Sequence, residues 1–117
     1  MAATLKKNLI VLVKEVKEGE ILTETYYTPA FIPLSVVYQA IDLSKEMGKV
    51  TLDNEVEIIN KMVDFVAKEI YKDQFTKEDL INGLHAPDAI QTLREQIIFI
   101  TRGQQSDEVK KLLAKKS

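Results

Sequence analysis

The chain has 117 residues, which is enough for one domain with a substantial hydrophobic core. Its 16 basic and 18 acidic side chains give a net charge of −2, which argues against a nucleic-acid-binding domain because such domains usually carry a basic excess. The absence of cysteine excludes disulfide bonds, thiolate metal sites and a cysteine nucleophile, and it fits a reducing compartment.

The first eight residues do not have the pattern of a signal peptide. The apolar run after Lys6 and Lys7 is short, and no small-residue cleavage site follows it. No apolar run in the sequence approaches the roughly 20 residues of a membrane-spanning helix. We therefore expect a cytoplasmic protein that does not bind membranes.

Residues 9–13 form a short, mostly β-branched run, and residues 21–27 are again rich in strand-forming side chains. Gly19 marks a turn between them, so the two runs predict an antiparallel hairpin. The apolar residues of segment 4–16 also fall at helical spacing, which leaves a helix as the alternative there, but the shortness of the run favours a strand. Because both faces of the first strand are apolar, we expect one face to be covered by cross-packing or by another subunit.

Two prolines, Pro29 and Pro33, predict an extended connector before the first helix. That helix is expected over residues 34–47 and ends at Gly48. Its expected inner stripe consists of Leu34, Val37, Ala40 and Ile41, with Met47 as a further candidate.

A second helix is expected over residues 53–71, capped by Thr51 or Asp53. Its apolar face is wide, which is typical of the central helix of a fold. The expected inner positions are Val56, Ile59, Val63, Val66 and Ile70.

A joint follows at residues 71–84, where the long helix stops and a short helix begins. Thr76 and Asp79 have the spacing of a capping box, and Phe75 and Leu80 have that of a hydrophobic staple. Gly83 is expected to end the short helix. These five residues form the predicted structural joint.

The last long helix is expected over residues 87–101, with Pro87 in its first turn and Gly103 after its end. Its expected inner positions include Ala86, Ile90, Leu93 and Ile97. The pattern predicts an α+β fold in which an N-terminal β-hairpin packs on about four α-helices. Residues 1–103 would form a single domain, and residues 104–117 a mobile C-terminal tail.

No catalytic pattern is present. The single histidine, His85, lies in a loop, and each acidic pair lies at a helix start, where the helix dipole explains it. No ligand set for a metal and no glycine-rich phosphate loop is present, so we expect no cofactor, no metal and no enzyme activity.

The positive signal is surplus apolar surface, which favours a protein that binds protein, itself included. On the helical pattern Phe99 falls on the polar side of the last helix, either as a partner contact or as incidental core packing. The candidate partner-binding residues lie on the first strand, the last helix and the tail, and are Leu9, Val11, Val13, Ile98, Phe99, Val109, Leu112 and Leu113.

Residues 76–101 also fit a helix-turn-helix, which makes a small DNA-binding regulator an alternative. The expected reading helix offers Gln91, Arg94 and Gln96 but also acidic residues. An oligomeric structural component of a virion is a third possibility.

The joint carries a family resemblance. Residues 73–84 read Asp-Gln-Phe-Thr-Lys-Glu-Asp-Leu-Ile-Asn-Gly-Leu and resemble the segment "nQFT-x-eeL-x-dGL" of tail assembly chaperones. These proteins come from long, non-contractile-tailed phages and prophages of Gram-positive bacteria. The apolar helix before the joint, the helix that follows it, and the proline-broken segment 31–34 also fit, so the resemblance covers residues 20–101.

The resemblance implies a non-catalytic protein of the host cytoplasm that is absent from the mature virion. It implies binding of the phage tape measure protein and recruitment of the major tail tube protein during tail assembly. A homo-oligomer is expected, and nucleic acid is not an expected partner.

Overall fold

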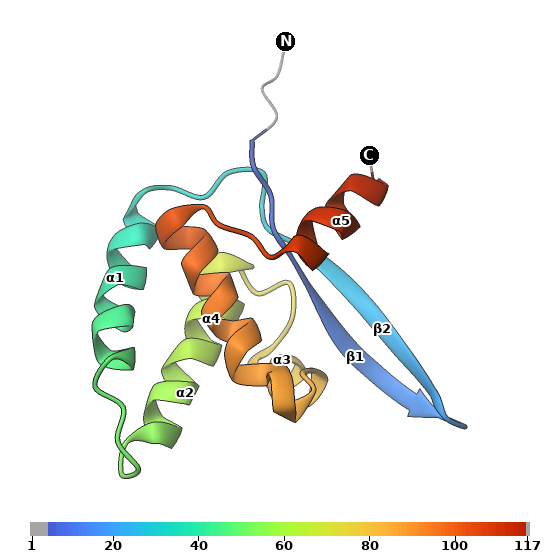
Figure 1. The fold of residues 1–117 in the computed structure, drawn as a ribbon, viewed down its shortest axis with the longest axis horizontal. Helices are drawn as coiled ribbons and strands as arrows, with labels where there is room; N and C mark the ends of the chain where they lie inside the picture. The colour runs from blue at the N-terminus through green and yellow to red at the C-terminus, as the bar shows by residue number, and fades with distance from the viewer. Residues whose placement is uncertain (1–4, 117) are drawn as a thin grey trace.

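The computed structural model describes residues 5–116 and has the expected α+β architecture, a two-stranded antiparallel hairpin followed by helices (Figure 1). The region predicted as the C-terminal tail contains the helix α5. The elements in chain order are β1 (Leu9–Lys17), β2 (Glu20–Tyr27), α1 (Ser35–Met47), α2 (Glu55–Asp64), η1 (Phe65–Ile70), α3 (Lys77–Gly83), α4 (Ala86–Arg102) and α5 (Asp107–Lys116).

Residues 9–13 lie in a β-strand of a hairpin, which confirms the predicted strand and excludes the helical alternative there. β1 and β2 pair from Leu9 opposite Tyr27 to Lys17 opposite Glu20, with an irregularity between Val13 and Glu15. Two residues close the turn, Glu18 and Gly19, and both have positive φ angles, 51° and 83°. Such a two-residue loop matches the right-handed twist of paired strands, which explains why the hairpin forms from local sequence.

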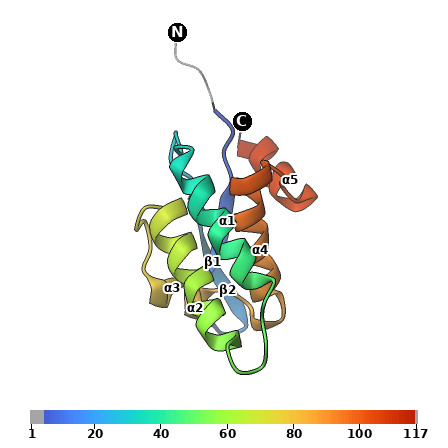
Figure 2. The same ribbon diagram turned by 90° about the vertical axis from the view of Figure 1, so that its left-hand side faces the viewer.

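Helices α1 to α4 lie together on one side of the hairpin root, with α1 packed over α2 and α4 (Figure 2). The core lies between these helices and the inner face of β1. The largest fully buried side chains are Ile10, Leu12, Val36, Val66, Ile70, Tyr71, Leu80, Leu93 and Ile97. Among residues 5–116, no helix has both the length and the apolar character needed to cross a bilayer.

Helix α1 forms where expected, and Ala40 faces inward as predicted, but Leu34 and Ile41 do not. Val36, Ala40 and Leu43 are buried, whereas Leu34 and Ile41 are exposed. The buried residues and the exposed apolar residues each fall at helical spacing, so α1 carries apolar side chains on two faces. Packing against α4 and α2 selects one face and leaves the other in solvent.

The second helix is continuous from residue 55 to 70, but its last turn is a π-helix, η1. Neither predicted cap is used, because Asn54 holds the N-cap position and its Oδ1 accepts a hydrogen bond from the Thr51 backbone N–H. The predicted inward position of Val56 is wrong, since it is exposed. The other buried positions agree with the wide apolar face that the pattern predicts, and they include Ile58, Met62, Val63, Val66 and Ile70.

The joint has the predicted capping box. The Thr76 backbone N–H donates to Asp79 Oδ2 at 3.0 Å, and the Asp79 backbone N–H donates to Thr76 Oγ1 at 3.0 Å. Phe75 and Leu80, the predicted staple residues, are both buried in the core. Before them, Lys72 and Asp73 have φ angles of 52° and 62°, a left-handed pair that turns the chain away from η1.

Gly83 has a role beyond ending α3. A Cβ added there would lie 3.0 Å from Leu12 Cβ and 3.2 Å from the Val13 carbonyl oxygen. The missing side chain therefore lets α3 lie directly against β1. The joint thus docks the hairpin as well as separating the two long helices.

Helix α4 ends as predicted, with Gly103 in the left-handed region at φ 67°. Leu93 and Ile97 are buried as expected, but Ala86 and Ile90 are exposed. Of the two alternatives for Phe99, a partner contact or core packing, its burial supports core packing, because the side chain is only 7% exposed. Phe99 closes one side of a groove under the proline-containing connector, together with Phe31, Ile32 and Val37.

Candidate protein-binding surfaces

A buried polar network centred on Gln96 joins the hairpin root to the helices. Gln96 Oε1 accepts hydrogen bonds from the Tyr71 hydroxyl at 2.7 Å and from Asn8 Nδ2 at 3.2 Å. Gln96 Nε2 donates to the Leu9 carbonyl at 2.9 Å. The network continues to Thr28, whose Oγ1 accepts from the Asn8 backbone N–H at 3.0 Å. Its groups satisfy one another, so the network holds the scaffold and offers no free group to a ligand.

Two further contacts attach the hairpin to the joint. Gln74 Nε2 donates to the Tyr27 carbonyl at 2.8 Å, and the rings of Tyr26 and Phe75 meet edge to face with centroids 4.8 Å apart. Every one of these contacts lies at the inner end of the hairpin. The outer end, residues 14–25, is exposed along its whole length, and we call it the hairpin arm.

The hairpin arm projects away from the helices and carries large apolar side chains in solvent (Figure 1). Val16 is 68% exposed and its cross-strand neighbour Ile21 is 63% exposed; Leu22, opposite Glu15, is also exposed. A two-stranded sheet leaves unpaired backbone groups on its outer edges, which can bind a further extended segment. The sequence prediction did not single out these residues, although their alternation with charged side chains in 14–24 was the available signal.

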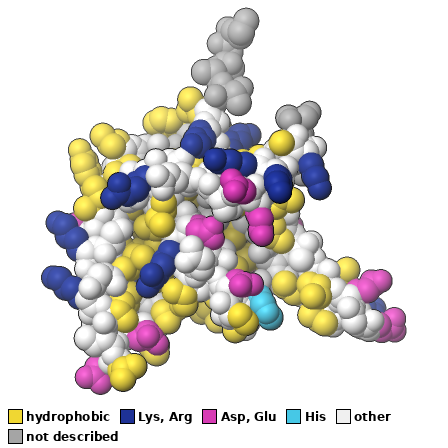
Figure 3. Space-filling model, in the orientation of Figure 1, with side chains coloured by type: hydrophobic (Ala, Val, Ile, Leu, Met, Phe, Trp, Pro, Cys, Tyr) yellow, Lys and Arg dark blue, Asp and Glu magenta, His cyan; other side chains and the backbone are white. Residues whose placement is uncertain are grey.

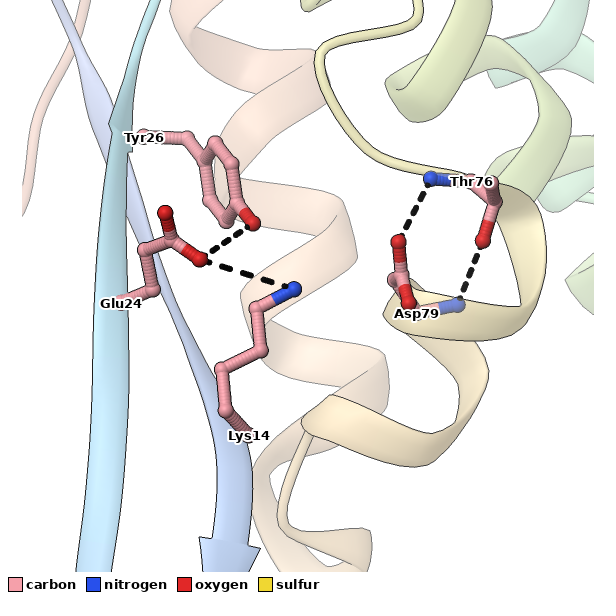
Figure 4. Close-up of polar contacts among 5 residues, drawn as sticks. All are labelled: Lys14, Glu24, Tyr26, Thr76 and Asp79. Carbon is pink, nitrogen blue, oxygen red and sulfur yellow. Dashed lines mark hydrogen bonds and ion pairs between the residues drawn. The ribbon is translucent and has the colours of Figure 1, made fainter.

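A polar cluster marks the base of the hairpin arm (Figure 4). Glu24 Oε2 accepts a hydrogen bond from the Tyr26 hydroxyl at 2.8 Å and lies 3.7 Å from Lys14 Nζ, which sits 5.2 Å from the Tyr26 ring centre. The contact with Tyr26, followed by the carboxylates of Asp79 and Glu24, raises the pKa of Lys14. The side chains here hold one another on the surface of the hairpin.

A second apolar surface lies on the outer side of α1. Leu34, Tyr38 and Ile41 are exposed and share one stripe, which we call the α1 face. Its lower part opens into a groove between α1 and α4. That groove has a volume of about 520 Å³ and is lined by Ile41, Ser44, Lys45, Ile98, Thr101 and Arg102.

The predicted partner-binding residues are not brought together. Leu9 and Phe99 are buried, so neither offers a contact on the surface of the folded chain. Val13, Val109 and Leu113 are half-buried, and Val11, Ile98 and Leu112 are exposed. Only Ile98 belongs to one of the two surfaces described above. The remaining exposed positions, Val11 and Leu112, lie on different elements, β1 and α5.

His85 is the exposed N-cap residue of α4, and its side chain makes no capping hydrogen bond. Among the described residues, no three His, Cys, Asp or Glu side chains lie close enough together to hold a metal ion. Burial raises the pKa of Tyr71, so its hydroxyl stays protonated and acts as a hydrogen-bond donor to Gln96.

Helices α3 and α4 form a helix–turn–helix in sequence order, but one of the three side chains expected to read DNA bases is not available on the surface of α4. Gln96, one of its three expected reading side chains, is buried and makes three hydrogen bonds within the protein. Leu93 and Ile97 pack the same helix into the core.

Comparison with known protein families identifies the chain. The profile of a family described as phage tail chaperone protein matches residues 4–117. No curated protein and no solved structure matches the chain. The family match extends over nearly all of the sequence, well beyond the segment 73–84 that suggested it, and confirms the predicted role in tail assembly. The protein belongs to the phage tail chaperone family.

Proposed function

We propose that this tail chaperone binds the tape measure protein of its phage through exposed apolar surface, keeps it soluble, and recruits tail tube subunits to it. The hairpin arm is the principal contact. The observation that supports this proposal is the exposure of Val16 and Ile21 on an arm whose fixed contacts are confined to its inner end.

The physical argument concerns the client. A long helical protein with apolar stripes aggregates unless the stripes are covered, and a small acidic domain with spare apolar surface can cover them. The arm carries four acidic residues, Glu15, Glu18, Glu20 and Glu24, against two lysines, Lys14 and Lys17, so its net charge is negative. Bound copies would therefore give the complex a negative surface that resists aggregation.

The proposal places the protein in the host cytoplasm during assembly and outside the finished virion. It acts by reversible binding, with no catalytic step, cofactor or metal. A long-tailed phage or prophage of Gram-positive bacteria is the proposed source, on the resemblance of residues 73–84.

Co-expression with the tape measure protein of the same phage tests the proposal. The chain should move that protein from the pellet to the soluble fraction and elute with it. The double variant Val16→Thr/Ile21→Thr should lose most of this effect, because it removes apolar surface but keeps strand-forming residues. The matched control is Lys17→Thr/Glu20→Thr, which alters the adjacent cross-strand pair without changing net charge or apolar surface.

Equal aggregation of the tape measure protein with and without the chain would overturn the proposal. If both double variants kept the tape measure protein equally soluble, the hairpin arm would not be the contact, and binding would be assigned to another surface. Salt-sensitive binding to DNA would favour the regulator instead. Recovery of the chain from purified virions would favour a structural component.

A further inference from the structure

Two surfaces of the chain carry exposed apolar side chains together with opposite charges, and neither is needed for the proposed binding by the hairpin arm. The first is the groove between α1 and α4. Its floor is apolar, formed by Ile41 and Ile98, and its rim carries the cations Lys45 and Arg102. No acidic side chain lines it, and within residues 5–116 neither cation makes an ion pair.

The second surface is the loop between α1 and α2 with the first turn of α2, residues 50–57, which we call the knob. Leu52 is 95% exposed, and Val56, four residues later, is exposed as well. Three carboxylates and no cation accompany them in this stretch. Glu57 is paired with Lys61 at 3.7 Å, whereas Asp53 and Glu55 make no ion pair within the described part of the chain.

Both surfaces lie on the side of the molecule that carries α1. Figure 2 shows α1 in front, α4 beside it, and the α1–α2 loop at the lower end of the same side. Acidic and hydrophobic side chains meet at that lower end, and basic side chains gather further up (Figure 3). A twofold axis perpendicular to this side would bring each knob onto the groove of the other copy, and such reciprocal contacts are the rule in twofold dimers.

We propose that two copies of the chain form a twofold dimer in which the knob of each inserts Leu52 and Val56 into the α1–α4 groove of the other. Asp53 and Glu55 then face Lys45 and Arg102 across the interface. The exposed side chain of Tyr38 extends the contact along the α1 face. This arrangement covers the apolar residues that the fold leaves open at both places and pairs four charges that have no partner within one chain.

The dimer leaves the hairpin arm outside the interface, so it presents two arms to a client. This consequence rests on the proposed function, but the dimer itself does not. Its test therefore uses the full chain alone, without any tail protein.

Sedimentation equilibrium over a range of concentrations measures the dissociation constant of the dimer for each variant. The wild type should be dimeric, and Leu52→Ser should weaken the dimer about tenfold or more, without loss of stability because the side chain is almost fully in solvent. Lys45→Glu/Arg102→Glu and Asp53→Lys/Glu55→Lys should each be monomeric, because like charges then face one another. An equimolar mixture of these two charge variants should again form dimers, as each groove then meets a knob of opposite charge.

The hairpin variant Val16→Thr/Ile21→Thr is the control and should dimerise like the wild type. Thermal unfolding by circular dichroism checks that every variant is folded. A monomeric wild type, or dimers unaffected by Leu52→Ser and by both charge reversals, would overturn the proposal. Dimer loss in the hairpin variant alone would place self-association on the arm instead. Neither result would decide whether the arm binds the tape measure protein.

Discussion

The hydroxyl of Tyr71 donates a hydrogen bond of 2.7 Å to Oε1 of Gln96, which ties the end of η1 to the middle of α4 inside the protein. Gln96 in turn holds Asn8 and the Leu9 carbonyl, at the point where the hairpin leaves the helices. Two segments about ninety residues apart are thus fixed by one side chain. The position of the hairpin arm therefore depends on a polar contact in the core.

Replacing Gln96 should be costly. Gln96→Ala leaves the Tyr71 hydroxyl, Asn8 Nδ2 and the Leu9 carbonyl without their partner, and we expect a loss of about 3 kcal/mol or more in unfolding free energy. Tyr71→Phe removes one donor only and should cost about 1 kcal/mol. Urea denaturation measures both, with exposed Gln91→Ala on the same helix as control. A Gln96→Ala cost equal to that of the control would show that the network contributes nothing.

Gly83 and Gly48 should respond in opposite ways to alanine. Gly83→Ala places a methyl group 3.0 Å from Leu12 Cβ, so α3 must move off β1, and we expect a loss of about 1 kcal/mol or more despite the better helix propensity of alanine. Gly48 has ordinary helical angles, and a Cβ added there would lie 3.5 Å from the Lys45 carbonyl oxygen and 3.8 Å from that of Ser44. Gly48→Ala should be neutral or stabilising by up to about 1 kcal/mol. Comparable melting temperatures for the two variants would refute the close approach of α3 to β1.

The capping box makes the stability of the fold depend on pH. The Thr76 backbone N–H, followed by its hydroxyl, lowers the pKa of Asp79 below the ordinary value of 3.8. The carboxylate thus stabilises the fold fully above pH 3.8, and this contribution is lost as the pH falls through the lowered folded pKa. Wild type should melt above Asp79→Asn at neutral pH, and the gap should close in acid. A gap that stays constant down to the acid transition would contradict the assignment to Asp79.

The features that sequence predicted well are those determined by neighbouring residues. The hairpin follows from a Gly19 turn between two β-rich runs, and the capping box from the spacing of Thr76 and Asp79. Each involves groups within a few positions of one another, so local preference suffices. The family resemblance was also carried by the joint, residues 73–84, because several such local signals occur together there.

The features that sequence missed depend on distant partners. Helix α1 has apolar side chains at Val36, Ala40 and Leu43 and again at Leu34, Tyr38 and Ile41, and periodicity cannot tell which set packs against α4. The burial of Gln96 depends on Asn8, 88 residues earlier. The exposure of the outer hairpin was missed for the same reason, since the helices bury Leu9, Ile10 and Leu12 at the inner end of the hairpin while residues 14–25 stay exposed.

Alanine variants of Phe99 and Ile98 distinguish a role in core packing from a role in dimer formation. Phe99 is buried beside the connector, so Phe99→Ala should lower the unfolding free energy by about 3 kcal/mol by leaving a cavity. Its neighbour Ile98 is 37% exposed and lines the α1–α4 groove, so Ile98→Ala should cost less than about 1 kcal/mol while weakening the dimer. Urea denaturation and sedimentation equilibrium on the same samples measure both effects. The sequence pattern suggested Phe99 as a partner contact. Unchanged stability of Phe99→Ala with lost self-association would restore that role and contradict its burial.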